Sequence, residues 1–255
     1  MKVRFWGVRG SIPIPGSETL RYGGNTPCIE VEGSGGECII LDAGTGLRVM
    51  GIDLVKRSSR LPDIHLFISH THWDHIQGFP FFAPCYVPGA VINLRGPAHF
   101  FKNKSLESVF DILMQYDFFP VSSQQLAARI AYESIMETSL EVGTVGIKTQ
   151  FANHPVQSLV YRLTQNGRTL VYTGDHEPYY NLFGRAGGAG APGQSDDDVL
   201  FGDVESTVAD ANGRFIDFIR GADLFVVDSQ YTPEEYPETR RNWVSVITAS
   251  TTYSS

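Results

Sequence analysis

Ser69-His70-Thr71-His72-Trp73-Asp74-His75 is the stretch of sequence that decides the fold. It places three histidines and one aspartate within six positions, directly after the apolar, β-type run Ile64-His65-Leu66-Phe67-Ile68. A strand that ends in such a cluster delivers several imidazoles and a carboxylate to one point, a ligand set that suits zinc, manganese or iron. The alternative is a solvated loop with chance histidines, but the strand directly before the cluster is the context expected of a metal motif.

The spacing within this cluster predicts two metal ions. Imidazoles two residues apart, at His70 and His72, can hold one ion. Asp74 and His75 can then face a second ion about 3.5–4 Å away, which is the usual separation in two-metal hydrolases.

The cluster resembles the HxHxDH signature of the metallo-β-lactamase fold superfamily. Two further stretches are similar to one branch of it, at residues 3–13 (VRFWGVRGSIP) and 22–28 (YGGNTPC). That branch groups ribonuclease-Z-like proteins, phosphonate-pathway phosphodiesterases and cyclic-nucleotide phosphodiesterase-like hydrolases. The resemblance runs from about residue 1 to Trp243.

The resemblance implies an α/β fold, an αββα sandwich of two mixed β-sheets flanked by helices. We expect one domain over residues 1–255, with an insertion around residues 79–150 and an atypical tail at residues 244–255. Apolar strands that end in acidic residues, such as Leu41-Asp42 and Val227-Asp228, fit the placement of sites at strand ends.

Two later elements extend the resemblance. Asn153-His154-Pro155 follows a strand-like run, and Thr173-Gly174-Asp175 ends another. The resemblance implies that metal 1 is held by His70, His72 and His154, and metal 2 by Asp74, His75 and a shared Asp175. A hydroxide between two divalent ions, zinc with manganese or iron as alternatives, would be the nucleophile, and Asp74 would orient it as a catalytic residue.

The chain departs from this pattern at the last expected ligand. Ser245 stands where relatives carry a histidine, and no histidine occurs after His176. Metal 2 would then lose one protein ligand, so its binding is expected to be weaker or its site more open. His176 is a candidate catalytic residue, as replacement ligand or general acid, and its alternative is an exposed or supporting histidine.

Composition narrows the class of substrate. The formal net charge is −8 and the sequence pI is near 5.3, without the basic stripe that nucleic-acid polymers require. A small phosphate ester drawn to bound metal remains compatible. The three cysteines lack metal-ligand spacing and are expected to be reduced in a cytoplasmic protein, in which we expect neither a signal peptide nor a membrane span.

Helical periodicity predicts helices at residues 46–56, 106–114, 123–128 with Ser122 as N-cap, and 211–220. Asn166-Gly167 predicts a hairpin turn. The aromatic and proline-rich segment 78–89 is predicted to cover the core, to form a hydrophobic wall beside the metals, or both.

Together these features predict a metal-dependent phosphodiesterase that acts on small, cyclic phosphodiesters and is promiscuous. The alternatives are a lactonase-, β-lactamase- or sulfatase-like hydrolase, and a degenerate metal-binding protein with little turnover. The β-prone tail from Trp243 would cover exposed apolar surface or pair with another chain's sheet edge, so we expect a homodimer.

Overall fold

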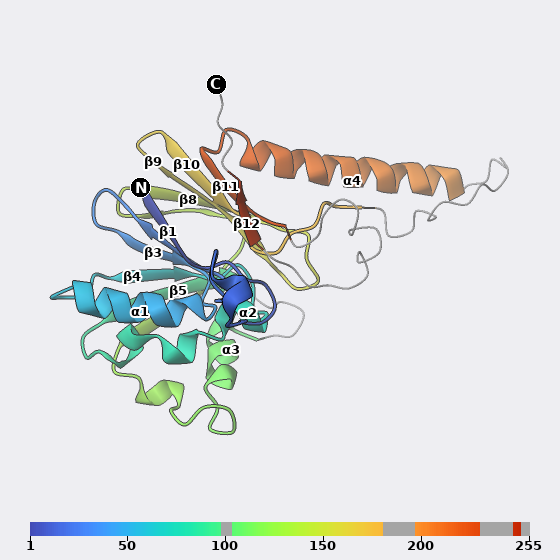
Figure 1. Ribbon diagram of the computed structural model, residues 1–255. Coiled ribbons are helices and arrows are strands. Elements are labelled where there is room, and N and C mark those ends of the chain that lie inside the picture. The colour runs from blue at the N-terminus through green and yellow to red at the C-terminus, as the bar shows by residue number, and fades with distance from the viewer. Residues whose placement is uncertain (98–103, 181–196, 230–246, 251–255) are drawn as a thin grey trace.

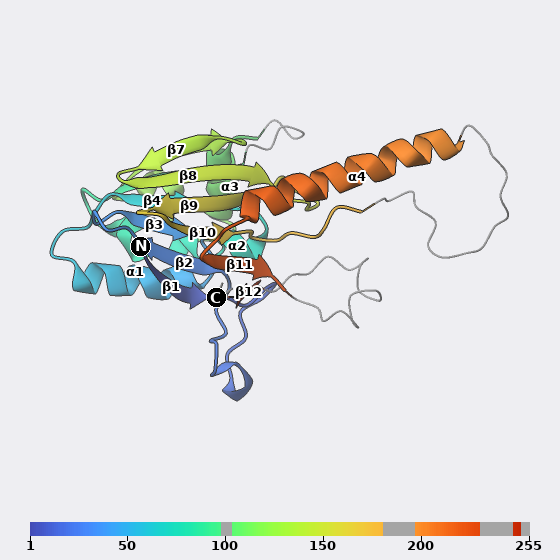
Figure 2. The same cartoon turned by 90° about the horizontal axis from the view of Figure 1, so that it is seen from above.

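In the described part of the chain, two mixed β-sheets of six strands each face one another, and helices lie on their outer surfaces (Figures 1 and 2). The computed structural model describes residues 1–97, 104–180, 197–229 and 247–250. This is the predicted αββα sandwich, with helices flanking both sheets.

The first sheet has the strand order β1-β2-β3-β4-β5-β6. Its first three strands pair antiparallel and β3 to β6 pair parallel. The strands are β1 (Lys2–Gly7), β2 (Cys28–Glu32), β3 (Cys38–Leu41), β4 (Ile64–Phe67), β5 (Val91–Pro97) and β6 (Arg129–Ile135).

The second sheet has the order β12-β11-β10-β9-β8-β7, with one parallel pair, β10 and β11. Its strands are β7 (Ser139–Val142), β8 (Val145–Phe151), β9 (Leu159–Gln165), β10 (Arg168–Tyr172), β11 (Leu224–Asp228) and β12 (Ile247–Ser250). Asn166 and Gly167 join β9 to β10 with φ of 52° and 71°. Two positive φ values are those of a type I′ turn, so the predicted hairpin is confirmed.

Strand β3 shows how the layers form from sequence. Its four residues are all buried, and alternate side chains point to opposite faces. Cys38 and Ile40 join the core under the helices, whereas Ile39 and Leu41 join the core between the sheets. A strand covered on both faces reads as a continuous apolar run, as this one does.

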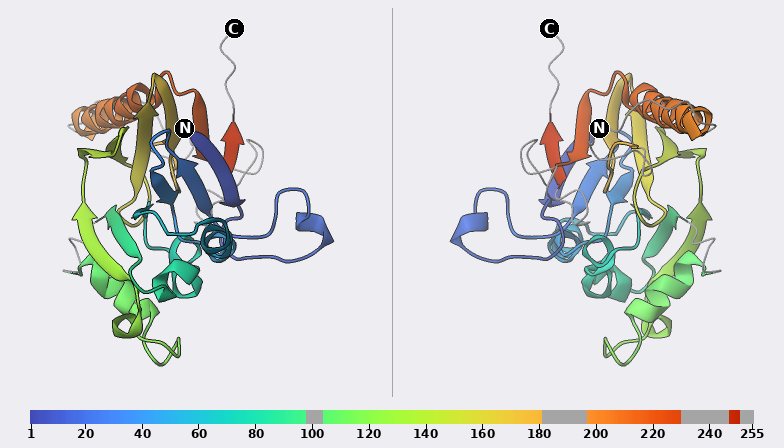
Figure 3. Two further views of the ribbon diagram at one scale, coloured as in Figure 1. Left: turned by 90° about the vertical axis from the view of Figure 1, so that its left-hand side faces the viewer. Right: turned by 90° about the vertical axis from the view of Figure 1, so that its right-hand side faces the viewer.

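The helices predicted at residues 46–56 and 106–114 are confirmed as α1 (Gly46–Arg57) and α3 (Leu106–Leu113), and both cover the first sheet. The second sheet is covered by the last turns of α4 (Asp197–Ile219), where Phe215 packs against strands β9 and β10. Figure 3 shows α4 beside that sheet and, on the opposite side of the molecule, the β1–β2 connection with the 3-10 turn η1 (Ser17–Thr19) reaching outward.

One predicted helix is wrong. Residues 123–128 form only the 3-10 turn η5 (Ser123–Gln125), although Ser122 and Gln125 make a capping box. The next residues leave the helical path because the backbone N–H groups of Ala127 and Ala128 donate to the carbonyl of Cys85, and β6 begins at Arg129. Tertiary hydrogen bonds therefore override a helical pattern only a few residues long.

The segment 78–89 covers the core, as predicted. It forms the 3-10 turns η2 (Phe79–Phe81) and η3 (Ala83–Tyr86), and both Phe79 and Phe82 are fully buried under the first sheet.

Residues 79–150, expected as an insertion, supply strands β5 and β6 to the first sheet and β7 and β8 to the second. Of the tail, β12 pairs antiparallel with β11 of the same chain, and Ser245 lies outside the described residues. The homodimer stays a prediction. Within the described ranges, none of the helices combines the length and apolar character needed to cross a membrane.

Replacing Phe82 should test the core assignment. Phe82→Ala removes a fully buried ring and should lower the free energy of unfolding by about 3–5 kcal/mol. Phe81→Ala is the matched control, since the neighbouring ring is 53% exposed, and should cost about 1 kcal/mol or less. Urea unfolding measures both, and equal losses would contradict the assignment.

Candidate metal centre

The histidine cluster follows β4 as an extended segment and then turns. Ser69 and His70 are fully buried at the end of the strand. His72 still has extended backbone, with φ −65° and ψ 152°, and the single helical turn α2 (Trp73–Ile76) begins after it. His70 and His72 therefore come from the extended part, whereas Asp74 and His75 come from the turn.

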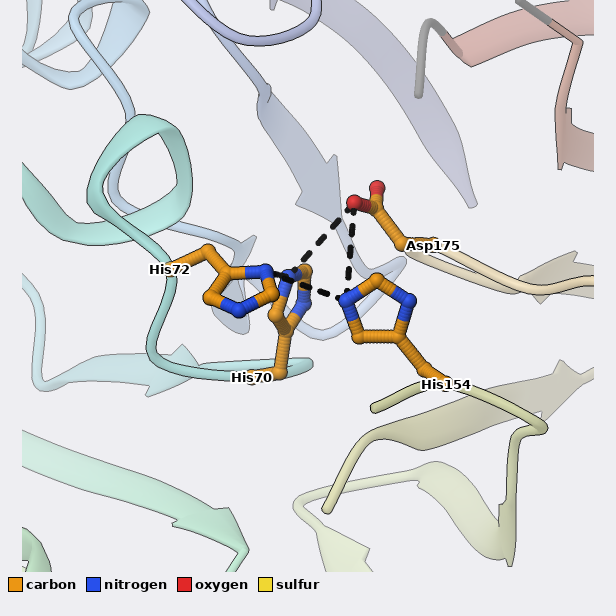
Figure 4. Close-up of side chains that lie close together, drawn as sticks. All are labelled: His70, His72, His154 and Asp175. Carbon is orange, nitrogen blue, oxygen red and sulfur yellow. Dashed lines mark hydrogen bonds and ion pairs between the residues drawn. The ribbon is translucent and has the colours of Figure 1, made fainter. Parts of the chain in front are cut away.

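Four predicted ligands meet in one group (Figure 4). Nε2 of His70 and Nε2 of His154 lie 3.1 and 3.0 Å from Nδ1 of His72. Oδ2 of Asp175 lies 3.6 Å from Nε2 of His70 and 3.9 Å from Nε2 of His154. The donor atoms all lie within 4.8 Å of one another, although the residues come from three separate loops.

The other two predicted ligands lie on the far side of the same carboxylate. Oδ1 of Asp175 is 3.1 Å from Nε2 of His75, which is 3.6 Å from Oδ2 of Asp74. Asp74 also accepts a hydrogen bond from the backbone N–H of Ser11 at 2.8 Å. Asp175 thus turns Oδ2 toward His70 and His154, which with His72 form the first half of the site. It turns Oδ1 toward His75, which with Asp74 forms the second half.

The three imidazoles of the first half are poor bases. Burial lowers the pKa of His70 well below its usual value and lowers that of His154 to about 4. Burial also lowers the pKa of His72. All three rings are therefore neutral near pH 7, and a neutral imidazole is the form that binds a metal ion.

The second half attracts positive charge. Burial alone would lower the pKa of His75, but the carboxylates of Asp175 and Asp42 outweigh it and raise that pKa well above the usual value. Burial would raise the pKa of Asp175, but His75 and His70 lower it. A cation is thus stabilised near Nε2 of His75.

These residues fit divalent metal ions. Nε2 of His75 and Oδ1 of Asp175 are both buried and lie 3.1 Å apart without an aligned hydrogen bond, and a bound cation would give both atoms a partner. Three nitrogens that bind one zinc ion tetrahedrally at about 2.0 Å lie about 3.3 Å apart, close to the two N···N distances given above. His70, His72, His154 and Asp175 would hold the first ion.

Asp42 supports the site, a role that its sequence context alone did not predict. Its carboxylate accepts the backbone N–H of Ser69 at 2.6 Å, the Ser69 hydroxyl at 2.7 Å, Nδ1–H of His75 at 2.7 Å and the hydroxyl of Tyr172. Its backbone has φ of 62°, a conformation that non-glycine residues rarely adopt. Because Nδ1 of His75 donates its proton to Asp42, the neutral form of His75 has its free lone pair on Nε2, the nitrogen that faces Asp175. Only the strand-ending position of Asp42 could have signalled this role.

The loops of the two sheets contact each other closely at Ser69. Gly174 has φ of 56°, and a Cβ atom there would lie 2.6 Å from Cβ of Ser69. The N–H of Leu159 donates to the carbonyl of Ser69 at 2.9 Å. Glycine before Asp175 is therefore needed both for its conformation and for the missing side chain.

His176 is buried but lies outside the group of four ligands. Its Nδ1 accepts the backbone N–H of Asn153 at 3.2 Å, and its ring stacks on Phe215 at 3.9 Å. Burial lowers its pKa to about 4. These contacts favour a residue that positions the neighbouring ligands His154 and Asp175. Its role as replacement ligand or general acid stays a prediction.

A cavity of about 860 Å³ opens beside the first donor group. His72 and His154 line it, together with Val109 and Ile112 of α3 and Phe151 at the end of β8. The segment 78–89 contributes no lining residue, so the hydrophobic wall comes from α3 instead. The packing of Phe79 and Phe82 into the core accounts for this difference.

The family model of the metallo-beta-lactamase superfamily matches residues 21–211. The chain belongs to the metallo-beta-lactamase superfamily. A comparison with curated proteins found no match.

Several solved structures are similar to this chain. The short form of human tRNase Z is 18% identical with a TM-score of 0.56, over 94% of this chain and 83% of that chain. The metallo-beta-lactamase fold protein YhfI from Bacillus subtilis is 21% identical with a TM-score of 0.46, over 67% of this chain and 61% of that one. A diphosphatase from the PhnP family is 17% identical with a TM-score of 0.49, over 67% of this chain and 63% of that one. This chain thus spans less than two thirds of the last two.

Acid should destabilise the metal-free protein. The folded-state pKa of His154 is about 4 and the ordinary value is 6.5, so between these pH values the unfolded chain binds a proton that the folded chain does not. Stability should therefore fall as the pH drops from 6.5 toward 4, by about 2 kcal/mol for this residue between pH 7 and pH 5. Urea unfolding in chelator measures the loss. In His154→Asn the free energy of unfolding should depend less on pH. An unchanged pH dependence would show that His154 is not the cause of the loss.

The Asp42 carboxylate should strengthen metal binding. Asp42→Asn removes the charge that orients His75 and should weaken zinc affinity by about 10–100-fold. Tyr172→Phe is the control, because it removes one donor to Asp42 but keeps the carboxylate, and should change affinity less than about threefold. Titration against a competing chelator gives both constants. A folded Asp42→Asn protein with parental affinity would disprove the role.

Proposed function

We propose that this protein is a metal-dependent phosphodiesterase that uses two divalent metal ions, zinc or alternatively manganese or iron, to hydrolyse small phosphodiesters. The observation that carries the proposal is the placement of Asp175. One of its oxygens faces His70 and His154, and the other faces His75. A carboxylate between two separate donor groups suits a shared ligand of two ions.

Each half of the site has its own part in the proposal. The neutral imidazoles of the first half, with Asp175, would hold metal 1, and His75, Asp74 and Asp175 would hold metal 2. When bound, such ions supply a nucleophilic water of lowered pKa and neutralise charge on a phosphoryl oxygen. Oδ2 of Asp74, fixed by the N–H of Ser11, would orient the attacking water. Asp42 keeps the ring of His75 in one orientation.

The charges around the site support an anionic substrate. Among the described residues, no aspartate or glutamate lines the cavity beside the ligands, although the chain as a whole carries a net charge of −8. An anion would otherwise be repelled by an acidic protein. Apolar side chains make up much of the wall, which suits an organic ester group better than a highly charged polymer.

A second candidate is a metal-binding protein with little turnover. The described residues supply three donors to the second half of the site, Asp74, His75 and Asp175. Ser245 stands at the expected position of one more ligand. Loose binding of metal 2 would leave the nucleophile poorly activated.

Metal content and hydrolysis together test the proposal. Protein purified without chelator should hold about two metal ions per chain and hydrolyse bis(4-nitrophenyl) phosphate. His72→Ala should reduce kcat/KM by more than about 100-fold, because it removes a ligand of the first ion. The control is His65→Ala, since His65 lies on β4 and contacts Arg95 instead of the site.

The outcomes separate the two candidates. Two ions with turnover that depends on His72 support the phosphodiesterase. One ion or fewer, with hydrolysis no faster than that of His72→Ala, would favour the metal-binding protein. Hydrolysis of a lactone or sulfate ester but of no phosphodiester would move the activity to another hydrolase class of this fold.

A further inference from the structure

The cavity beside the metal centre is lined by two chemically different kinds of side chain. The polar ones include His72 and His154, whose ring nitrogens belong to the first donor group. Apolar side chains of the lining include Val109 and Ile112 of α3 and Phe151 at the end of β8. Its volume of about 860 Å³ is in the range of pockets that hold whole organic ligands.

Among the residues that the structure describes, Lys104 is the one lysine or arginine that lines this cavity. It is exposed and directly precedes Ser105, the residue that caps α3 by accepting the N–H of Ser108. Its backbone is therefore attached to a capped helix end. Among the residues that the structure describes, no carboxylate forms an ion pair with Lys104.

A substrate held at the metal centre would therefore share its cavity with a second cationic group, Lys104, and with apolar side chains. A phosphodiester group at the metals accounts for one negative charge. A second anionic group on the ester substituent could pair with Lys104, and such charge-assisted hydrogen bonds are stronger than neutral ones. Trp73, 69% exposed and part of the lining, offers a flat surface to an aromatic substituent.

We propose that Lys104 is a specificity-determining residue, and that the preferred substrates are phosphodiesters whose ester substituent is flat or apolar and carries a second anionic group. The inference rests on the proposed phosphodiesterase activity and names its substrate class. Lys104 acts on binding of the substituent and does not touch the reacting atoms.

The kinetic test uses two esters of the same shape that differ by one charge. Bis(4-nitrophenyl) phosphate is compared with 4-nitrophenyl 4-carboxyphenyl phosphate, in which a carboxylate replaces one nitro group. Both release 4-nitrophenol, and their intrinsic difference in reactivity cancels when variants are compared with the parent. Lys104→Gln should reduce kcat/KM for the carboxylate ester about tenfold and change it less than twofold for the dinitro ester.

Two further variants sharpen the result. Lys104→Arg keeps the charge and should retain at least half of the preference for the carboxylate ester. Lys148→Gln is the matched control, because Lys148 is an exposed lysine of β8 that does not line the cavity. It should leave both esters unchanged, and equal effects of Lys104→Gln and Lys148→Gln would overturn the inference.

A binding measurement separates this inference from the proposed function. Calorimetric titration compares 4-carboxyphenyl phosphate with phenyl phosphate, neither of which is a phosphodiester. The parent protein should bind the carboxylate compound about tenfold more tightly, and Lys104→Gln should abolish the difference. If binding of 4-carboxyphenyl phosphate depends on Lys104 but neither ester is hydrolysed, the phosphodiesterase activity is refuted and the anion site at Lys104 is supported. Hydrolysis with no dependence on Lys104 in either assay would refute the site and keep the phosphodiesterase.

Discussion

The buried carboxylate of Asp175 is the interaction on which the rest of the site depends. Removing a charged carboxylate from water costs several kcal/mol unless opposite charge or hydrogen bonds compensate. Here its two oxygens face histidines of two groups, and Oδ1 makes no hydrogen bond of its own. The cost is offset by His75 and His70, which lower its pKa, and would be offset further by bound metal.

The two-sheet architecture makes this arrangement possible. Asp175 follows a strand of the second sheet, whereas His70 and His75 follow β4 of the first, so the ligands meet where the sheets join at one end. Contacts between Gly174 and Ser69, and between Leu159 and Ser69, hold the two edges in register. The ligand set is therefore complete only when the two sheets have packed together, since neither sheet alone contains all the ligands.

Support for the ligands comes from buried polar groups with fixed partners. Asp42 collects four hydrogen bonds in the core and orients His75. His176 links the backbone of Asn153 to α4 through its stacking on Phe215. Fully satisfied buried groups of this kind fix one arrangement of the ligands, because any displacement would leave a buried partner unpaired.

The sequence by itself determined most of the elements, because strand runs, helical periodicity and the Asn166-Gly167 turn are local properties of the chain. It also supplied the six candidate ligands, through the spacing from His70 to His75 and the resemblance at His154 and Asp175. Only the tertiary structure decided that Asp175 divides its oxygens between two groups, that Asp42 supports His75, and that α3 forms the cavity wall. These features depend on which loops meet and on the strained backbone of Asp42, and no local pattern encodes either. The helix predicted at residues 123–128 was wrong for a similar reason, because hydrogen bonds to Cys85, which is distant in the sequence, outweighed a short helical pattern.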